Sequence, residues 1–187
     1  MGHMVQQESK IKQFARKNNA FLQKTLEELS QIPAPSHREE KRREYCQRWL
    51  EQFGIVSQSD EKGNLVIPYR LKEEKQNLLF IAHMDLVFED TVPLQIKKEG
   101  TIWNCPGIGD NTANVVLMLF LAKFLKEQEP DLEQGILLAI DTCEEGLGNL
   151  EGCSALMQRY ADKVSGVIAF DLYRDQIYTE CIGSVRY

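Results

Sequence analysis

The sequence predicts an α/β protein with a mixed, largely parallel sheet flanked by helices. Amphipathic helical patterns alternate along the chain with short apolar runs that have the length of buried strands. Three of these runs end in ionisable residues, which is typical of a site at the carboxyl edge of such a sheet. With 187 residues, the chain is long enough for one domain with a hydrophobic core.

Two helices are expected before the first main strand. Apolar residues recur every three or four positions over 11–29, and Pro33 ends this first helix. Ser36 and Glu39 have the spacing of a capping box, so a second helix is expected from there to Gly54. The residues of this helix that we expect in the core are Tyr45, Trp49, Leu50 and Phe53.

Strands and helices alternate over the rest of the chain. Apolar and alternating runs predict strands at 64–69 and 77–83, and Gly100 is expected at the turn of a hairpin. The remaining expected elements are the hairpin strands 94–98 and 101–103, a helix from about 111, a buried strand at 135–141, a short helix at 153–161, a buried strand at 167–171 and a further strand at 176–182.

The composition argues against several classes of partner. A net charge of −6 disfavours nucleic acid or an anionic membrane surface as the main partner. No apolar run approaches the roughly 20 residues that span a bilayer, and no secretory signal is visible. Five cysteines without a C-x-x-C pair favour a reduced cytoplasm. Residues 1–4 resemble an expression scar, so we expect the domain proper to cover 5–187.

Four segments are expected to carry ionisable side chains to one edge of the sheet. Three apolar strands end in HMD, DTCEE and AFD, and the loop PGIGDNTAN opens a helix. Crowded carboxylates repel unless cations neutralise them, and one imidazole among carboxylates suits zinc, manganese or cobalt. The candidate residues are His83, Asp85, Asp110, Glu144, Glu145 and Asp171.

Each of these residues, taken alone, is also compatible with a structural role. His83 fits a hydrogen-bonded residue at a strand end, Asp110 fits a helix cap, and Asp171 fits the start of a turn. The pair at 144–145 fits a solvated loop. The common ending of three buried strands favours a site. In that case the Asp85 carboxylate can accept a hydrogen bond from the ring N–H of His83 and fix its tautomer, provided that the strand persists through Asp85.

The motifs HMD, GIGDNTAN, DTCEEGLGN and AFD, in this order and spacing, resemble the M20 family of di-zinc metallopeptidases. The resemblance covers roughly residues 22–187. It implies a three-layer, zinc-exopeptidase-like sandwich and an enzyme that cleaves peptide bonds with two Zn²⁺ ions, or with Mn²⁺ or Co²⁺. It also implies that His83 and Asp171 bind the first metal, that Glu145 binds the second, and that Asp110 bridges both beside a cis peptide to Asn111.

The same resemblance implies the catalytic roles. Glu144 would act as general base on a bridging water activated by the metals, and Asp85 would orient His83. An aspartate at position 171 favours an aminopeptidase or dipeptidase over a carboxypeptidase or deacylase. The implied substrates are short peptides or N-acyl amino acids.

The chain departs from the family at its C-terminal end. It ends at CIGSVRY, near the point where family members enter a lid or dimerisation domain and later return with a second metal-binding histidine. His37 does not take the place of that histidine, because it precedes a helix. We therefore expect the N-terminal portion of a catalytic domain, nearly inactive by itself, in a protein that could form a homodimer through its lid.

Three other interpretations remain open from the sequence. An N-acyl amino-acid deacylase or a carboxypeptidase would use the same chemistry with another substrate pocket. A binding or scaffold module would keep the fold without activity, although all the site residues carry suitable side chains. A thiol nucleophile at Cys143 would need a histidine base. Since His37 has no evident route to it, Cys143 is expected to be a small buried residue.

Overall fold

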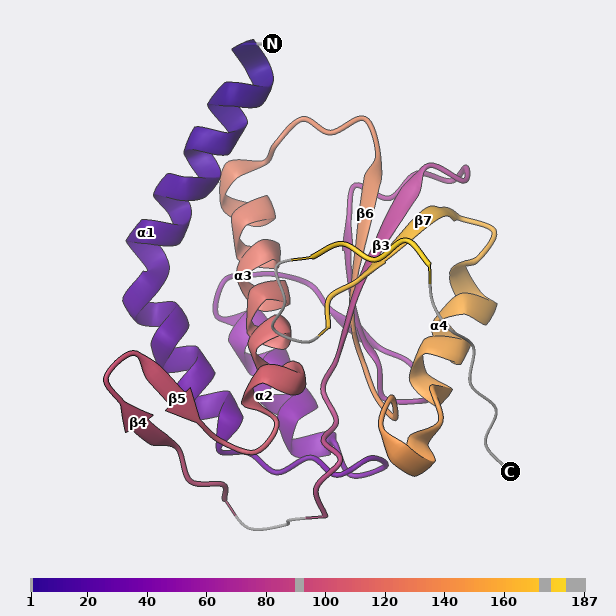
Figure 1. Cartoon of the computed structure of the whole chain (residues 1–187). Coiled ribbons are helices and arrows are strands. Elements are labelled where there is room, and N and C mark those ends of the chain that lie inside the picture. Colours follow the sequence, from indigo (N-terminus) through magenta and orange to yellow (C-terminus); the bar gives the residue numbers. More distant parts are fainter. Residues whose placement is uncertain (1, 90–92, 172–175, 181–187) are drawn as a thin grey trace.

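A five-stranded sheet forms the centre of the molecule (Figure 1). The computed structural model describes residues 2–89, 93–171 and 176–180. The strand order is β1-β2-β6-β3-β7, in which β6, β3 and β7 run parallel and β1 and β2 add antiparallel pairs. This confirms the predicted mixed, largely parallel sheet. The strands are β1 (Gln58–Ser59), β2 (Leu65–Tyr69), β3 (Asn77–His83), β6 (Gly135–Asp141) and β7 (Val164–Ala169).

Helices cover both faces of the sheet and make it the middle of three layers. Figure 1 shows α1 (Gly2–Ser30), α2 (Glu40–Glu51) and α3 (Ala113–Gln128) on one side and α4 (Glu151–Tyr160) on the other. Side chains of alternate residues of β6 pack into the cores on the two faces of the sheet. Ile136, Leu138 and Ile140 join the core beneath the first three helices, whereas Leu137 and Ala139 face the core beneath α4. A strand buried on both faces needs apolar residues at every position, which explains the run GILLAI.

Aromatic rings pack α1, α2 and α3 against one another on one face of the sheet. Trp49 of α2 stacks on Phe21 of α1 at 5.7 Å between centroids and lies 5.1 Å from the ring of Phe120 of α3. Such ring contacts stabilise a core beyond the area that they bury. The burial of Trp49 and Leu50 confirms the core face predicted for α2.

One segment of the described chain, Ile108–Gln128, is long and apolar enough to cross a membrane by length and composition alone. In the fold, 61% of its most apolar window is buried inside the protein. The helix α3 lies in this segment and packs against α1, α2 and the sheet. Its apolar character is therefore explained by the protein core that it forms.

A short hairpin lies outside the main sheet. The strands β4 (Lys97–Glu99) and β5 (Ile102–Asn104) pair antiparallel around Gly100, whose φ is +62°. This confirms the turn expected at Gly100, because a positive φ is readily adopted by glycine. The first strand is shorter than predicted, since it covers Lys97–Glu99 and not 94–98, and the second is shifted by one residue.

The predicted capping box at the start of α2 is wrong. Glu39 occupies the N-cap position, and no side-chain cap hydrogen bond is present there. The Ser36 hydroxyl instead donates to Asp85, and the Glu39 carboxylate accepts from the backbone of Cys143. Both side chains are thus used by contacts with distant segments, which compete with the local cap.

The buried strand predicted at 167–171 is also wrong in part. The strand β7 begins earlier, at Val164, and Asp171 lies beyond its end. As the edge strand, β7 leaves Val167 and Ile168 45% and 43% exposed. An apolar run does not reveal whether a strand has neighbours on both sides. Residues 176–180 form no strand, and the last two residues of the strand predicted at 176–182 lie outside the described residues.

Candidate metal centre

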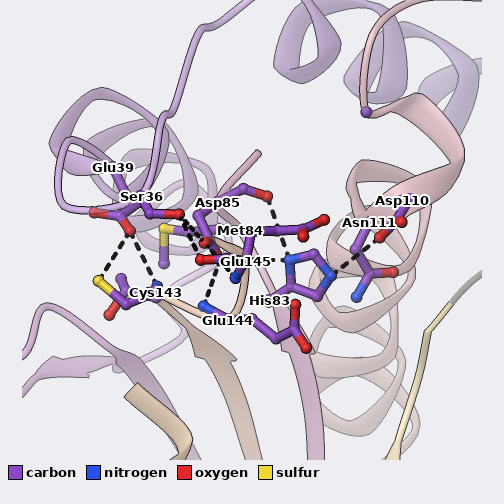
Figure 2. Close-up of polar contacts among 12 residues, drawn as sticks. Ser36, Glu39, His83, Met84, Asp85, Asp110, Asn111, Cys143, Glu144 and Glu145 are labelled. Atoms are coloured by element: carbon purple, nitrogen blue, oxygen red, sulfur yellow. Dashed lines mark hydrogen bonds and ion pairs between the residues drawn. The ribbon is translucent and has the colours of Figure 1, made fainter. Parts of the chain in front are cut away.

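The candidate site lies at the carboxyl edge of the three parallel strands (Figure 2). His83 is the last residue of β3 and is in register with Asp141, the last residue of β6. Asp171 follows β7 by two residues. The chain thus brings three strand ends to one edge because parallel neighbours must end on the same side.

His83 is buried and stands between carboxylates on both sides of its ring. Its Nδ1 lies 3.4 Å from Asp85 Oδ1 and 3.3 Å from the Asp85 carbonyl oxygen. Its Nε2 lies 3.2 Å from Asp110 Oδ1 and 3.7 Å from Asp171 Oδ1. The strand ends at His83, yet Asp85 still reaches the ring, so persistence of the strand is not required for this contact.

The donor set fits a divalent metal ion. His83 Nε2 is buried and makes no hydrogen bond within the described part of the chain, although two carboxylates lie at ion-pair distance. Two groups of side chains each offer ligand atoms that all lie within 4.8 Å of one another. The first group is His83, Asp110 and Asp171, and the second is His83, Glu144 and Glu145. A borderline metal that accepts both imidazole and carboxylate matches these donors.

Asp110 comes from an irregular turn before α3. Within the segment Ile108–Thr112, Asp110 and Asn111 have non-helical backbone angles, and the peptide bond between them is cis. Asn111 Nδ2 donates to the Phe170 carbonyl oxygen at 2.9 Å. This bond joins the loop that carries Asp110 to the chain immediately before Asp171, so the two carboxylates are held near each other.

Charge and burial act together on the titratable groups of the site. Burial lowers the pKa of His83, but contacts with the Asp171 and Asp85 carboxylates outweigh burial and raise it to about 11. Burial raises the pKa of Glu144 and of Glu145, and neighbouring carboxylates add to this rise. Burial also raises the pKa of Asp85, but the hydrogen bonds from His83 and Ser36 leave it lowered overall. The nearby carboxylates thus favour the protonated form of His83 in the metal-free site.

Without metal, the chain is expected to lose stability as the pH rises. The pKa of His83 in the folded chain, about 11, exceeds the ordinary histidine value of 6.5, so the stabilisation by this proton is complete below pH 6.5 and is lost toward pH 11. Burial raises the pKa of Asp141 from 3.8 to about 7. This shift also lowers the stability of the folded chain as the pH rises from 3.8 to about 7. Urea midpoints measured with a chelator should therefore fall between about pH 6 and about pH 9. A midpoint that rises over this interval would contradict the expectation.

Several residues that hold the site were missed by the sequence analysis. Arg42 is fully buried, and its guanidinium donates to the carbonyl oxygens of Ile32 and Met84 and to Thr112 Oγ1. It therefore ties the loop after α1 to the segments that carry His83 and Asp110. An arginine in the charged helix EKRREYCQ gives no sequence signal of burial. Asp141 was detectable, since a carboxylate that ends an all-apolar strand is unusual.

The expectation that His37 has no route to Cys143 is wrong. His37 Nδ1 lies 3.3 Å from Cys143 Sγ. Burial raises the pKa of Cys143 to about 11, and the nearby Glu39 carboxylate adds to the rise. The residue is therefore a thiol at neutral pH, whereas the thiolate is the nucleophilic form. The expectation of a small buried residue is confirmed, since Cys143 is 5% exposed.

A sequence model of peptidase family M28 matches residues 64–182. The matched region contains all six candidate site residues, from His83 to Asp171. A comparison with curated proteins found no match.

Solved structures of peptidases share the fold. The aminopeptidase PepT from Bacillus cereus is 21% identical with a TM-score of 0.65, over 80% of this chain and 42% of its own. A tripeptidase from Staphylococcus aureus is 24% identical with a TM-score of 0.66, over 82% and 43%. The Bacillus subtilis YXEP protein, described as a dinuclear metal binding peptidase from the M20 family, is 17% identical with a TM-score of 0.60, over 88% and 44%. This chain thus spans about two fifths of the length of these structures.

Proposed function

Because the chain belongs to peptidase family M28, whose model matches residues 64–182, we propose that it forms the metal-binding portion of a peptide hydrolase. The observation that carries this proposal is the buried Nε2 of His83, which makes no hydrogen bond to any described residue and faces Asp110 and Asp171. A buried nitrogen in this state is costly unless a ligand takes the position. A divalent cation satisfies the nitrogen and neutralises the carboxylates in one step.

The proposed metal is zinc, with manganese or cobalt as alternatives. His83 and Asp171 would hold one ion together with Asp110, and Glu145 would hold a second. The sequence resemblance implies that Asp110 would bridge both ions. A bound ion of this kind lowers the pKa of water from 15.7 to about 7 and polarises a substrate carbonyl. Asp85 acts on His83 from the other side, since its carboxylate can accept a hydrogen bond from Nδ1–H, which leaves Nε2 to face the ion.

Glu144 is the proposed general base. Its carboxylate lies in the same group as His83 and Glu145, and burial raises its pKa above the ordinary glutamate value of 4.5. A base with a raised pKa accepts a proton from water more readily and can return it to the leaving amine. Its neighbour Glu145 supplies a ligand, so the two adjacent residues divide the roles. This division rests on the sequence resemblance, since either carboxylate offers a ligand atom.

The substrate proposed is a short peptide that is cleaved at its N-terminal end. Solved structures with this fold include an aminopeptidase and a tripeptidase. The sequence resemblance also implies that an aspartate at position 171 favours an aminopeptidase or dipeptidase. An N-acyl amino-acid deacylase or a carboxypeptidase is the alternative, because the same residues would serve either bond. A scaffold without activity is the further alternative.

The remaining parts of the proposal concern the whole protein. The domain at 5–187 would be the N-terminal portion of a catalytic domain, and further chain would supply a second histidine, a lid and a dimer interface. Fewer than half of the residues in the solved relatives named above align with this chain, which supports that view. A cytoplasmic location, and no role for nucleic acid or membrane, are proposed from the composition.

Hydrolysis assays with added metal test the proposal. A free tripeptide and an N-acetyl amino acid are offered to this chain and to the longest natural protein that contains it, with zinc, manganese or cobalt, and with chelator as control. We expect the longer protein to cleave the tripeptide in a metal-dependent manner and this chain to be nearly inactive. Cleavage of only the N-acetyl substrate would favour the deacylase, and absence of both activities from the longer protein would favour the scaffold.

A further inference from the structure

Four consecutive amides after β6 have no partner in a sheet or helix and are bound by side chains instead. The N–H of Thr142 donates to Asn64 Oδ1 at 3.1 Å, and the N–H of Cys143 donates to Glu39 Oε1 at 3.1 Å. The N–H groups of the next two residues, 144 and 145, donate to the two oxygens of Asp85 at 3.1 and 2.9 Å. Buried amides outside regular structure require such acceptors.

Glu39 concentrates three of its contacts on one oxygen. In addition to the Cys143 amide, Oε1 accepts the N–H of His37 at 3.0 Å and lies 3.4 Å from Cys143 Sγ. The residue is only 5% exposed. Figure 2 shows Glu39 beside Cys143 and away from the His83 ring, and Glu39 belongs to neither group of possible metal ligands. Its contacts are thus directed at the backbone that precedes the two glutamates.

Ser36, three residues before Glu39, contacts the chain on the other side of Glu144. Its hydroxyl donates to Asp85 Oδ2 at 2.7 Å and lies 3.2 Å from the carbonyl oxygen of Glu145 (Figure 2). Residues 36–39 thus reach the chain on both sides of Glu144, at Cys143 and at Glu145. The separation in sequence exceeds 100 residues for both contacts.

The backbone at Cys143 adopts a conformation that requires such support. Its φ is +55°, in the left-handed region that non-glycine residues avoid. The chain also folds back tightly here, since a Cβ added at Gly148 would lie 2.6 Å from backbone atoms of Cys143. A strained residue of this kind persists only where surrounding contacts determine it.

We propose that Glu39, assisted by Ser36, is a positioning residue for the Glu144–Glu145 pair. It accepts the Cys143 amide and thereby holds the left-handed turn that directs the two carboxylates toward His83. The functional meaning of this inference rests on the proposed role of Glu144 and Glu145, whereas the hydrogen bonds themselves do not. Loss of the acceptor at Glu39 should loosen the turn locally. The amides of residues 144 and 145 bind Asp85, which lies against His83, so a looser turn should also weaken zinc binding at His83. Partners behind the ligands typically contribute about 10- to 100-fold in metal affinity.

Three variants of the full chain test this inference. Glu39→Met keeps most of the side-chain volume and removes the acceptor, whereas Glu39→Gln restores an oxygen. Glu40→Met is the matched control, because Glu40 is exposed and adjacent in sequence. Amide hydrogen exchange is measured on the metal-free proteins, zinc affinity is measured by calorimetric titration, and thermal melting reports global stability.

The expected result is faster exchange at residues 143–145 and about 10-fold weaker zinc binding in Glu39→Met, with both restored by Glu39→Gln and unchanged in Glu40→Met. The inference would be overturned if Glu39→Met lowered the melting temperature but changed neither the exchange at 143–145, relative to the rest of the chain, nor the zinc affinity. If Glu39→Met does not fold, Glu39→Asp, which withdraws the oxygen by one methylene, is measured in its place with the same expected direction.

The two proposals fail in distinguishable ways. If the unsubstituted chain binds no zinc, the proposed metal site is contradicted, and the exchange rates alone then decide whether Glu39 holds the turn. If zinc binds and exchange at 143–145 does not respond to Glu39→Met, the metal site stands and the positioning role of Glu39 is overturned.

Discussion

Replacing His83 with alanine should abolish zinc binding by this chain. Both groups of possible ligands include His83, and it is the one nitrogen donor in either group. We expect the unsubstituted chain to bind about one zinc ion, because His83, Asp110 and Asp171 complete a three-ligand protein site. Zinc at about 100 times its dissociation constant should then stabilise this chain by ~2.7 kcal/mol, and it should stabilise the His83→Ala variant by almost nothing.

Calorimetric titration with zinc and urea unfolding with and without zinc measure this effect. His37→Ala is the matched control, since His37 is exposed and lies in neither ligand group. The control should bind zinc as the unsubstituted chain does. Zinc binding that survives His83→Ala would place the metal elsewhere and contradict the proposed centre. Two ions per chain would mean that solvent or a second copy completes the Glu145 site.

Replacing Glu144 with glutamine should remove hydrolysis and leave metal binding in place. Glutamine has nearly the same shape as glutamate but does not take up a proton from water. General acid–base catalysis contributes about 10²- to 10⁴-fold, so kcat of the longer natural protein should fall by that range. The backbone N–H of residue 144 still reaches Asp85 in the variant, so the turn is expected to persist.

The neighbouring residue provides the comparison for this variant. Glu145→Gln, a change of identical size one position away, should weaken binding of a metal ion, and its activity should recover in part when more zinc is supplied. Glu144→Gln should not recover with added zinc. If Glu144→Gln weakens zinc binding as strongly as Glu145→Gln, Glu144 is a ligand and another group must serve as base. The steady-state rate against zinc concentration separates these outcomes.

Local patterns carried much of the fold and the identity of the candidate residues. The strands expected at 77–83 and 135–141 were found with those bounds, because a strand buried on both faces leaves a continuous apolar run. The acidic and histidine endings of the runs at positions 83, 144 and 145 were visible because ionisable residues stand out against apolar neighbours. The same reasoning placed Asp110 in a loop before α3, where the structure has it.

Contacts between distant segments were not visible in this way. Ser36 and Glu39 fit the local spacing of a capping box, yet their partners lie 49 and 104 residues away in Asp85 and Cys143. Arg42 had the appearance of a solvated helix residue, although it is fully buried among carbonyl oxygens. A local sequence pattern indicates only whether neighbouring residues along the chain suit a helix or strand. It gives no information about contacts with residues far away in the sequence.

The sequence by itself therefore determined the α/β class, the order of the main elements and the set of ionisable residues at the strand ends, because each depends on hydrophobic periodicity or on residue type. The tertiary structure alone decided that β7 is an exposed edge, that His83 stands between Asp85 and Asp110, and that Glu39 holds Cys143 in its left-handed turn. Those features depend on which segments meet in space. Burial, hydrogen bonding and charge act over a few ångströms between atoms, whatever their separation along the chain.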